Sequence, residues 1–135
     1  IDLFNNEVIA WSISKRNDLE LVRATLDQLS KVPGVYGAIL HSDQGFQYTS
    51  KGYANRIASL GLIGSNSRRG NCFDNACIES FFSHLKAEEI YLNKPESYEV
   101  AKRNIAAYIN YYNNSRFQTK LSERSPVEYR KALAA

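Results

Sequence analysis

The sequence predicts an α/β layer fold, and three observations carry that prediction. A short apolar run at residues 37–40 has the length of a β-strand and leads into a polar turn at residues 41–45. Apolar residues recur at helical spacing over residues 19–29, directly behind the N-cap candidate Asp18. Helix and strand patterns then continue along the chain, as is typical of helices that pack on a sheet.

The remaining elements are predicted in turn. Residues 3–13 predict a β-hairpin whose turn contains Asn5 and Asn6, because Asn tolerates the positive φ of a tight turn. Downstream, the patterns predict a helix over about 50–60, a strand over 62–65, a helix from 74 or 75 to 89, a helix from 97 to about 112 and a short terminal helix near Pro126. No internal repeat or low-complexity linker interrupts this order.

Length and composition fit a single domain over residues 1–135, with 44% hydrophobic residues available for a core. The net charge of +3 permits a polyanionic partner without demonstrating one. No apolar run approaches the roughly 20 residues of a membrane helix, and no signal-peptide pattern opens the chain, so we expect a cytoplasmic protein without a membrane partner. The sequence begins abruptly at Ile1 and contains no Met, which we interpret as a piece of a longer protein.

The two cysteines give no clear metal site. Cys72 and Cys77 lack the C-x-x-C pattern, and a zinc site built from them with His41 and His84 would fit no standard ligand spacing. Reduced thiols are the favoured interpretation.

Three groups of residues are candidates for chemistry, although each has an ordinary explanation when taken alone. Asp43 follows a predicted strand, where open α/β sheets place functional groups, but an Asp there is more often a turn residue. Glu79 and Lys86 fall on one face of a predicted helix, which is usually a solvated face. Arg68 and Arg69 lie in a polar loop, and the planar guanidinium suits phosphate, but basic loops are common.

The combination of motifs is more specific than any one of them. In chain order the motifs are His41-Ser42-Asp43-Gln44-Gly45, Gln47-Tyr48-Thr49-Ser50, Ser67-Arg68-Arg69-Gly70-Asn71-Cys72, Asp74-Asn75-Ala76, Glu79-Ser80-Phe81-Phe82, Leu85-Lys86, Tyr112-Asn113, Arg116 and Ser125-Pro126. Together they resemble the integrase core domain of DDE-type insertion-sequence transposases, which are related to retroviral integrases. Asp43 and Glu79 are separated by the 35 residues typical of that family, and Lys86 follows Glu79 by seven positions. Gln118 stands where the family commonly has His.

The resemblance implies a ribonuclease-H-like fold, in which a mixed sheet is flanked by helices and residues from about 97 to 135 form a helical extension. It further implies a polynucleotidyl transferase that cleaves and joins DNA through three carboxylates holding two Mg²⁺ or Mn²⁺ ions. Asp43 and Glu79 would be two of those catalytic and metal-binding residues, while Lys86, Arg68 and Arg69 would bind DNA. Such chemistry is reasonable because Mg²⁺ prefers oxygen ligands and two ions can assist an in-line phosphoryl displacement.

The first catalytic aspartate of the family has no counterpart among the expected elements. The family carries it on a first strand, and Asp2 instead matches an Asp-Leu-Phe segment on the second strand. We therefore expect a core truncated at its N-terminal side that lacks the first strand, and we expect the isolated chain to be inactive. The helix-turn-helix region that reads element ends in this family is also absent from the 135 residues.

Two alternatives remain open at this point. One is a ribonuclease-H-like nuclease unrelated to transposition, against which the motif segment from Tyr112 to Pro126 argues. The other is a non-catalytic DNA-binding or assembly module of a degenerate element, against which the retained carboxylates Asp43 and Glu79 argue. The favoured interpretation implies transposon ends and target DNA as partners, a homo-oligomer, and a bacterial, nucleoid-associated location.

Overall fold

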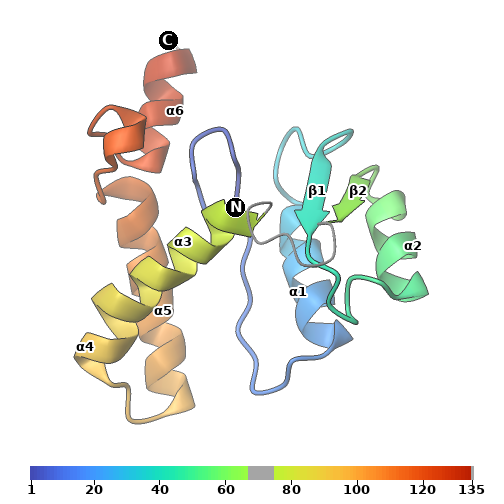
Figure 1. The fold of residues 1–135 in the computed structure, drawn as a ribbon, viewed down its shortest axis with the longest axis horizontal. Coiled ribbons are helices and arrows are strands. Elements are labelled where there is room, and N and C mark those ends of the chain that lie inside the picture. The colour runs from blue at the N-terminus through green and yellow to red at the C-terminus, as the bar shows by residue number, and fades with distance from the viewer. Residues whose placement is uncertain (67–74, 135) are drawn as a thin grey trace. The chain divides into compact units, whose positions relative to one another are not determined.

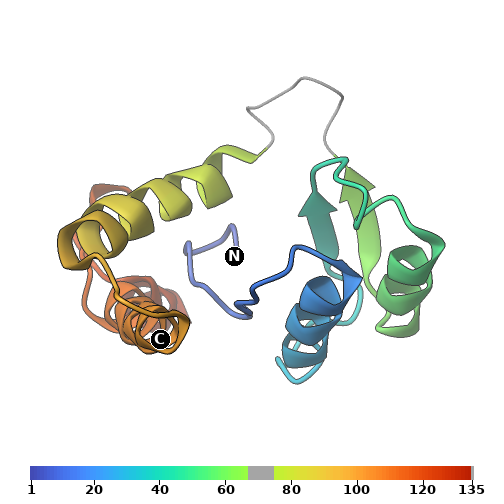
Figure 2. The ribbon, with the colours of Figure 1, turned by 90° about the horizontal axis from the view of Figure 1, so that it is seen from below.

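The computed structural model describes residues 1–66 and 75–134; the remaining positions, 67–74 and 135, lie outside the described residues. The chain divides into two compact units (Figures 1 and 2). The central unit comprises Ile9–Ala76, and the terminal unit comprises Ile1–Val8 together with Cys77–Ala135. No helix in the described ranges is long and apolar enough to cross a membrane.

The central unit contains two helices and a two-stranded parallel sheet. Its elements are α1 (Leu19–Leu29), β1 (Ile39–Ser42), α2 (Lys51–Ser59) and β2 (Ile63–Asn66). The strands pair in register from Ile39 opposite Ile63 to Ser42 opposite Asn66, and α2 provides the crossover between them. Both helices begin on the side of this unit where the strands end (Figure 1). The apolar core consists of Leu26, Leu29, Tyr53, Ile57 and Leu62.

Local sequence signals explain where these helices begin and end. Asp18 caps α1 by accepting a hydrogen bond from the Leu21 amide at 3.1 Å. Ser50 caps α2 in the same way, through the Tyr53 amide at 3.2 Å. Gly61 follows α2 with a φ of +68°, and the Tyr36 ring occupies the place where a Cβ atom would lie. Glycine is therefore needed there for both conformation and space.

Helices dominate the terminal unit. A continuous helical run contains α3 (Ala76–Leu85), the π-helical turn η2 (Lys86–Ile90) and α4 (Tyr91–Asn93), and it ends at Lys94 with a φ of +41°. It is followed by α5 (Tyr98–Asn114), the short 3₁₀ turn η3 (Thr119–Leu121) and α6 (Pro126–Ala134). Phe81 and Tyr112 meet edge to face in the core at 5.0 Å between ring centroids, joining α3 to α5.

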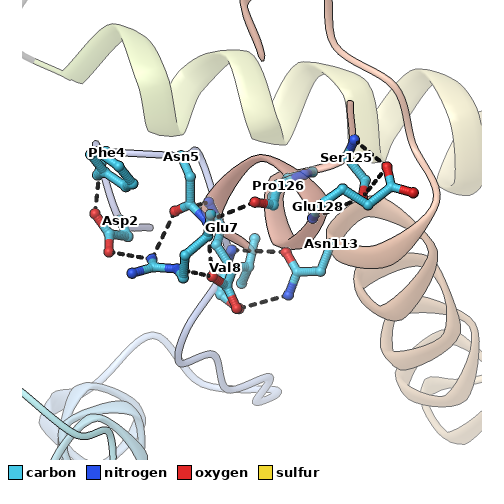
Figure 3. A network of polar contacts seen from close by, with 10 residues as sticks. Asp2, Phe4, Asn5, Glu7, Val8, Asn113, Ser125, Pro126 and Glu128 are labelled. Atoms are coloured by element: carbon cyan, nitrogen blue, oxygen red, sulfur yellow. Dashed lines mark hydrogen bonds and ion pairs between the residues drawn. The ribbon is translucent and has the colours of Figure 1, made fainter. Parts of the chain in front are cut away.

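A polar network ties residues 2–8 to the C-terminal part of the terminal unit (Figure 3). The Asn113 side chain accepts from the Val8 amide and donates to the Val8 carbonyl, each at 2.9 Å. The fully buried Asn5 donates to the Pro126 carbonyl at 2.9 Å. Arg130 donates to Asp2 at 2.6 Å and to Glu7 at 2.9 Å. We call these contacts of residues 2–8 with Asn113, Pro126 and Arg130 the clasp.

The predicted α/β class and the predicted helices are confirmed, whereas the hairpin is correct only in its turn. Asn6 has the positive φ expected of a tight turn, at 59°, but a single antiparallel bridge joins Asp2 to Glu7 and residues 8–14 form no strand. In the described residues the sheet has two parallel strands, so the antiparallel members of a mixed sheet are missing there. An isolated hairpin is marginal in water, and the Asn113 amide provides the backbone of Val8 with the two bonds that a strand neighbour would make.

Candidate active site

Asp43 lies directly after β1, at the carboxyl end of the parallel sheet. It is exposed, and one carboxylate oxygen accepts a hydrogen bond from the Gly45 amide at 2.7 Å, which closes a tight turn. A Cβ atom on Gly45 would lie 3.0 Å from that same Asp43 oxygen, so the turn has little room for another residue. Asp43 makes no ion pair with any described residue.

Gln47 fixes the loop that carries Asp43. Its side chain is buried, with 5% of the residue exposed, and its amide nitrogen donates to the Asn17 side chain at 2.6 Å. Its backbone carbonyl accepts from the Ser50 hydroxyl at 3.0 Å, and Ser50 caps α2. The loop from Asp43 to Ser50 is therefore held at two points, one before α1 and the other at the start of α2. The motif around Gln47 was recognised from the sequence, but this anchoring role was missed.

Glu79 and Lys86 both lie on the long helical run of the terminal unit. Glu79 is exposed in the first turn of α3, and Lys86 is the exposed first residue of the π-helical turn η2. The predicted helix around them is thus present and extends to Asn93. Glu79 and Asp43 belong to different units, so their predicted proximity stays a prediction.

Asp2 occupies a structural position in the terminal unit. One of its oxygens accepts from the Phe4 amide at 2.9 Å and the other pairs with Arg130 at 2.6 Å. Burial raises the pKa of Asp2, but the hydrogen bonds from Arg130 and Phe4 outweigh this, and the pKa is lowered. Both oxygens of this carboxylate are therefore already engaged, one by Arg130 in the clasp and the other by the Phe4 amide.

The other candidates are divided between the described and the undescribed parts of the chain. Arg68, Arg69 and Cys72 lie outside the described residues. Cys77 is exposed, and His41 contacts the Ser65 hydroxyl at 3.0 Å. Among the residues that the structure describes, no three His, Cys, Asp or Glu side chains form a group that could hold a metal ion.

A charged cluster of Arg116, Glu88 and His84, the last two close to Lys86 in the sequence, was also not predicted from the sequence. Arg116 contacts Glu88 through two nitrogens, the closest pair being 2.6 Å apart, and its guanidinium lies 3.1 Å from His84. Hydrogen bonds from Arg116 hold the pKa of Glu88 below its usual range, and burial together with Glu88 raises the pKa of Tyr108. The spacing of His84 and Glu88, four residues apart on one helix, was the available signal. Arg116 was recognised as a motif residue without a role.

Comparison with protein families gives a match along almost the whole chain. A profile described as "Integrase core domain" matches residues 1–72, and a second profile with the same description matches residues 79–133. The chain belongs to the integrase core domain family. The order of motifs from His41 to Pro126 is therefore explained by membership of this family, as the resemblance indicated.

Relatives of this integrase core are bacterial transposases. The putative transposase InsK for insertion sequence element IS150 of Escherichia coli K12 is 44% identical over 96% of this chain and 46% of its own length. The transposase for insertion sequence element IS904 of Lactococcus lactis is 39% identical over 97% of this chain and 53% of its own length. The chain thus spans about half the length of these curated relatives.

Solved structures show the same fold at low identity. The catalytic core domain of BIV integrase matches with a TM-score of 0.68 at 18% identity, covering 91% of this chain and 78% of that one. A chain of the simian T-cell lymphotropic virus intasome, in a complex with PP2A regulatory subunit B56 gamma, matches with a TM-score of 0.71 at 15% identity, covering 86% and 41%. The integrase core therefore has the predicted ribonuclease-H-like α/β fold.

Proposed function

We propose that this integrase core is the catalytic portion of an insertion-sequence transposase that cleaves and joins DNA with divalent metal ions, and that Asp43 and Glu79 are two of its metal-binding residues. The observation that carries the proposal is the position of Asp43, exposed and fixed in a tight turn at the carboxyl end of a parallel strand. Family membership and the transposase relatives support the reaction class.

The chemistry of the two carboxylates suits Mg²⁺ or Mn²⁺. Both side chains are exposed and neither forms an ion pair with a described residue, so the Glu79 carboxylate and the Asp43 oxygen that does not accept from Gly45 are accessible to a hard cation. When bound, two such ions would stabilise the attacking and leaving oxygens of an in-line phosphoryl displacement. The protein's own contribution would be rigid placement: the Gly45 amide orients Asp43, and Gln47 fixes the loop.

Asp2 does not fit the role of the third carboxylate. Unlike Asp43, it is paired with an arginine, and freeing the oxygen that accepts from Arg130 would break this contact of the clasp. We therefore propose that the third carboxylate lies outside these 135 residues and that they do not cleave or join DNA on their own. With only two carboxylates, metal ions would bind weakly and would not position either oxygen of the reaction.

DNA binding is proposed to involve Lys86 together with Arg68 and Arg69. Lys86 is exposed and follows Glu79 by seven residues on the same helical run, and the two arginines precede that run in the sequence. We also propose that the intact protein acts as a homo-oligomer, since one of the solved structures with this fold is an intasome chain. Sedimentation of the protein at high concentration should show species larger than a monomer, and a single monomer would refute this part.

The reaction is tested with labelled DNA that carries the element's own end, incubated with Mg²⁺ or Mn²⁺. Two proteins are compared, the 135-residue chain and a version extended upstream with the parent coding sequence. We expect products only from the extended version, and we expect Asp43→Asn and Glu79→Gln to abolish them.

Glu99→Gln is the matched control, because Glu99 occupies the first turn of α5 as Glu79 occupies the first turn of α3. It should leave activity unchanged. Products from the extended Asp43→Asn protein would refute the assignment of Asp43. Products from the 135-residue chain that disappear with Asp2→Asn would instead make Asp2 the third catalytic residue.

A further inference from the structure

Two exposed cations lie next to the anchors of the Asp43 loop in the central unit. Arg16 directly precedes Asn17, whose side chain accepts from Gln47 at 2.6 Å. Lys51 directly follows Ser50, whose hydroxyl donates to the Gln47 carbonyl at 3.0 Å. The Cα atom of each cation therefore lies about 3.8 Å from the Cα atom of a residue that is hydrogen-bonded to Gln47. The Arg16 turn is itself tight, because the Arg16 amide donates to the Ser14 hydroxyl at 3.1 Å.

None of the other described cations of the central unit adjoins a residue that contacts Gln47; Lys15 is exposed but lies one residue further from Asn17 than Arg16 does. Arg23 pairs with Glu20, and Arg56 pairs with Asp27. Lys31 is exposed and forms no ion pair with a described residue, but it follows the C-terminal end of α1, whereas Arg16 precedes its beginning. Arg16 and Lys51 therefore differ from Lys31 in position and not in exposure.

The side of the unit on which they lie is the side of Asp43. Helices α1 and α2 begin where the parallel strands end, and Asp43 follows the end of β1 (Figure 1). Arg16 lies just before α1, and Lys51 is the first residue of α2. A chain of phosphates that passes over the Asp43 carboxylate would need neutralising charge on this side. Exposed Arg and Lys side chains provide it, and Arg also donates two parallel hydrogen bonds to one phosphate.

We propose that Arg16 and Lys51 form a phosphate-binding rim that holds the DNA backbone beside Asp43, and that the Asn17–Gln47 contact fixes the position of Arg16 relative to that carboxylate. This inference rests on the proposed function, because it takes DNA as the substrate. It adds two described residues of the central unit to the DNA-binding residues Arg68, Arg69 and Lys86 proposed above.

The rim is tested with the 135-residue chain by fluorescence anisotropy on a labelled DNA duplex, in EDTA and over a series of salt concentrations. Arg16→Ala and Lys51→Ala should each weaken binding about three- to tenfold and reduce the steepness of the salt dependence by about one, since each removes one phosphate contact. Lys31→Ala, the matched control with the same loss of charge, should change affinity less than twofold. Equal effects of the three substitutions would overturn the rim.

The role of the Asn17–Gln47 contact is tested by coupling. Asn17→Ala removes the 2.6 Å bond without changing charge. If the contact positions Arg16, then Arg16→Ala should cost at least threefold less affinity in the Asn17→Ala background than in the native chain. Additive effects would overturn the positioning role, and circular dichroism would verify that each variant is folded.

Failure of this inference is distinguishable from failure of the proposed function. The anisotropy assay contains no metal and does not depend on Asp43 or Glu79 chemistry. If DNA binding is unaffected by Arg16→Ala and Lys51→Ala while the extended protein cleaves DNA, only the rim is refuted. If the rim substitutions weaken binding but the extended protein retains cleavage with Asp43→Asn, the assignment of Asp43 is refuted and the rim stands.

Discussion

The central and terminal units are stabilised over very different distances along the chain. In the central unit, the contact that fixes the Asp43 loop joins residues 30 positions apart. In the terminal unit, the clasp joins residues 105 to 128 positions apart. Closing a longer loop costs only slightly more entropy, but its contacts form only after distant segments have met. The central unit is thus organised by neighbouring segments, and the terminal unit by pairing of its two ends.

The ion pairs of the two units differ in how far they are exposed to solvent. In the central unit, the Arg56–Asp27 pair is well exposed, with 38% and 60% of the two side chains accessible. In the terminal unit, the Arg116 side chain is only 17% exposed where it pairs with Glu88. Exposed pairs contribute little to stability, whereas breaking a partly buried one leaves a charge without its partner. Polar contacts should therefore stabilise the terminal unit more than the central one.

Core substitutions should not distinguish the units, and they should have the largest effects. Phe81 in α3 and Leu26 in α1 are each 4% exposed. We expect Phe81→Ala and Leu26→Ala each to lower the free energy of unfolding by about 3–5 kcal/mol, measured by chemical denaturation followed by circular dichroism. Phe82, which is 47% exposed, is the control, and Phe82→Ala should cost less than about 1.5 kcal/mol. An equal cost at positions 81 and 82 would contradict the assigned core.

Arginine substitutions should separate the units most clearly. Arg116→Ala should lower the free energy of unfolding by about 2–3 kcal/mol, because Glu88 loses charge-assisted hydrogen bonds in a partly buried site. The corresponding substitution in the central unit, Arg56→Ala, should cost at most about 1 kcal/mol. Chemical denaturation of both variants under identical salt measures the difference, and equal costs would break the comparison.

The Asn113 side chain offers a sharper test of the clasp. Asn113→Ala removes both hydrogen bonds to the Val8 backbone, and Val8 is only 8% exposed. We expect a loss of about 2 kcal/mol, since the buried backbone groups are left without partners. The adjacent Asn114 is exposed and bonds only within its own helix, so Asn114→Ala should change stability by about 0.5 kcal/mol or less. A larger effect at position 114 would refute the strand-like role of Asn113.

Acidification should give the smallest effect of this series. In the folded protein, hydrogen bonds from Arg116 lower the pKa of Glu88 against the effect of burial. Burial raises the pKa of Asp2, but the hydrogen bonds from Arg130 and the Phe4 amide together outweigh it, and the pKa is lowered. A lowered folded-state pKa gives stability that is present above the unfolded pKa and is lost as the pH falls through the folded value. Stability should therefore decline below about pH 4. Glu88→Gln should make this decline shallower, and an unchanged pH profile in denaturation experiments would contradict the assigned pair.

Much of the central unit could be predicted because local patterns determine it. The caps Asp18 and Ser50 place the starts of α1 and α2 where the sequence indicated them. Strand β1 was predicted two residues too early, at residues 37–40, and is found at Ile39–Ser42. Its limits are set by backbone pairing with β2 and not by hydrophobicity. The apolar character of the run does not imply a buried strand, since Ile39 is 70% exposed.

The parts that could not be predicted depend on contacts between distant residues. Gln47 lies between two aromatic residues in a segment whose composition is typical of a surface turn. Its burial depends on Asn17, which is 30 residues away in the sequence and accepts a hydrogen bond from its side chain. The prediction of hairpin strands was wrong for a related reason, because the backbone of Val8 is paired by the side chain of Asn113, 105 residues away. Gln118, which departs from the family pattern, likewise accepts a hydrogen bond from Asn6 at 3.0 Å. Periodicity carries no information about such pairs.

The clasp also determines when the terminal unit can be completed during protein synthesis. Residues 2–8 are synthesised well before their partners Asn113, Pro126 and Arg130, which follow 105 to 128 positions later in the chain. At about 5–20 residues per second, the first segment waits about 5–25 seconds for these partners. All segments of the central unit are translated within that interval, so its sheet can form on the ribosome while residues 2–8 are still unpaired. A newly synthesised chain therefore passes through a stage in which the Asp43 loop is already anchored and the unit that carries Glu79 is still incomplete.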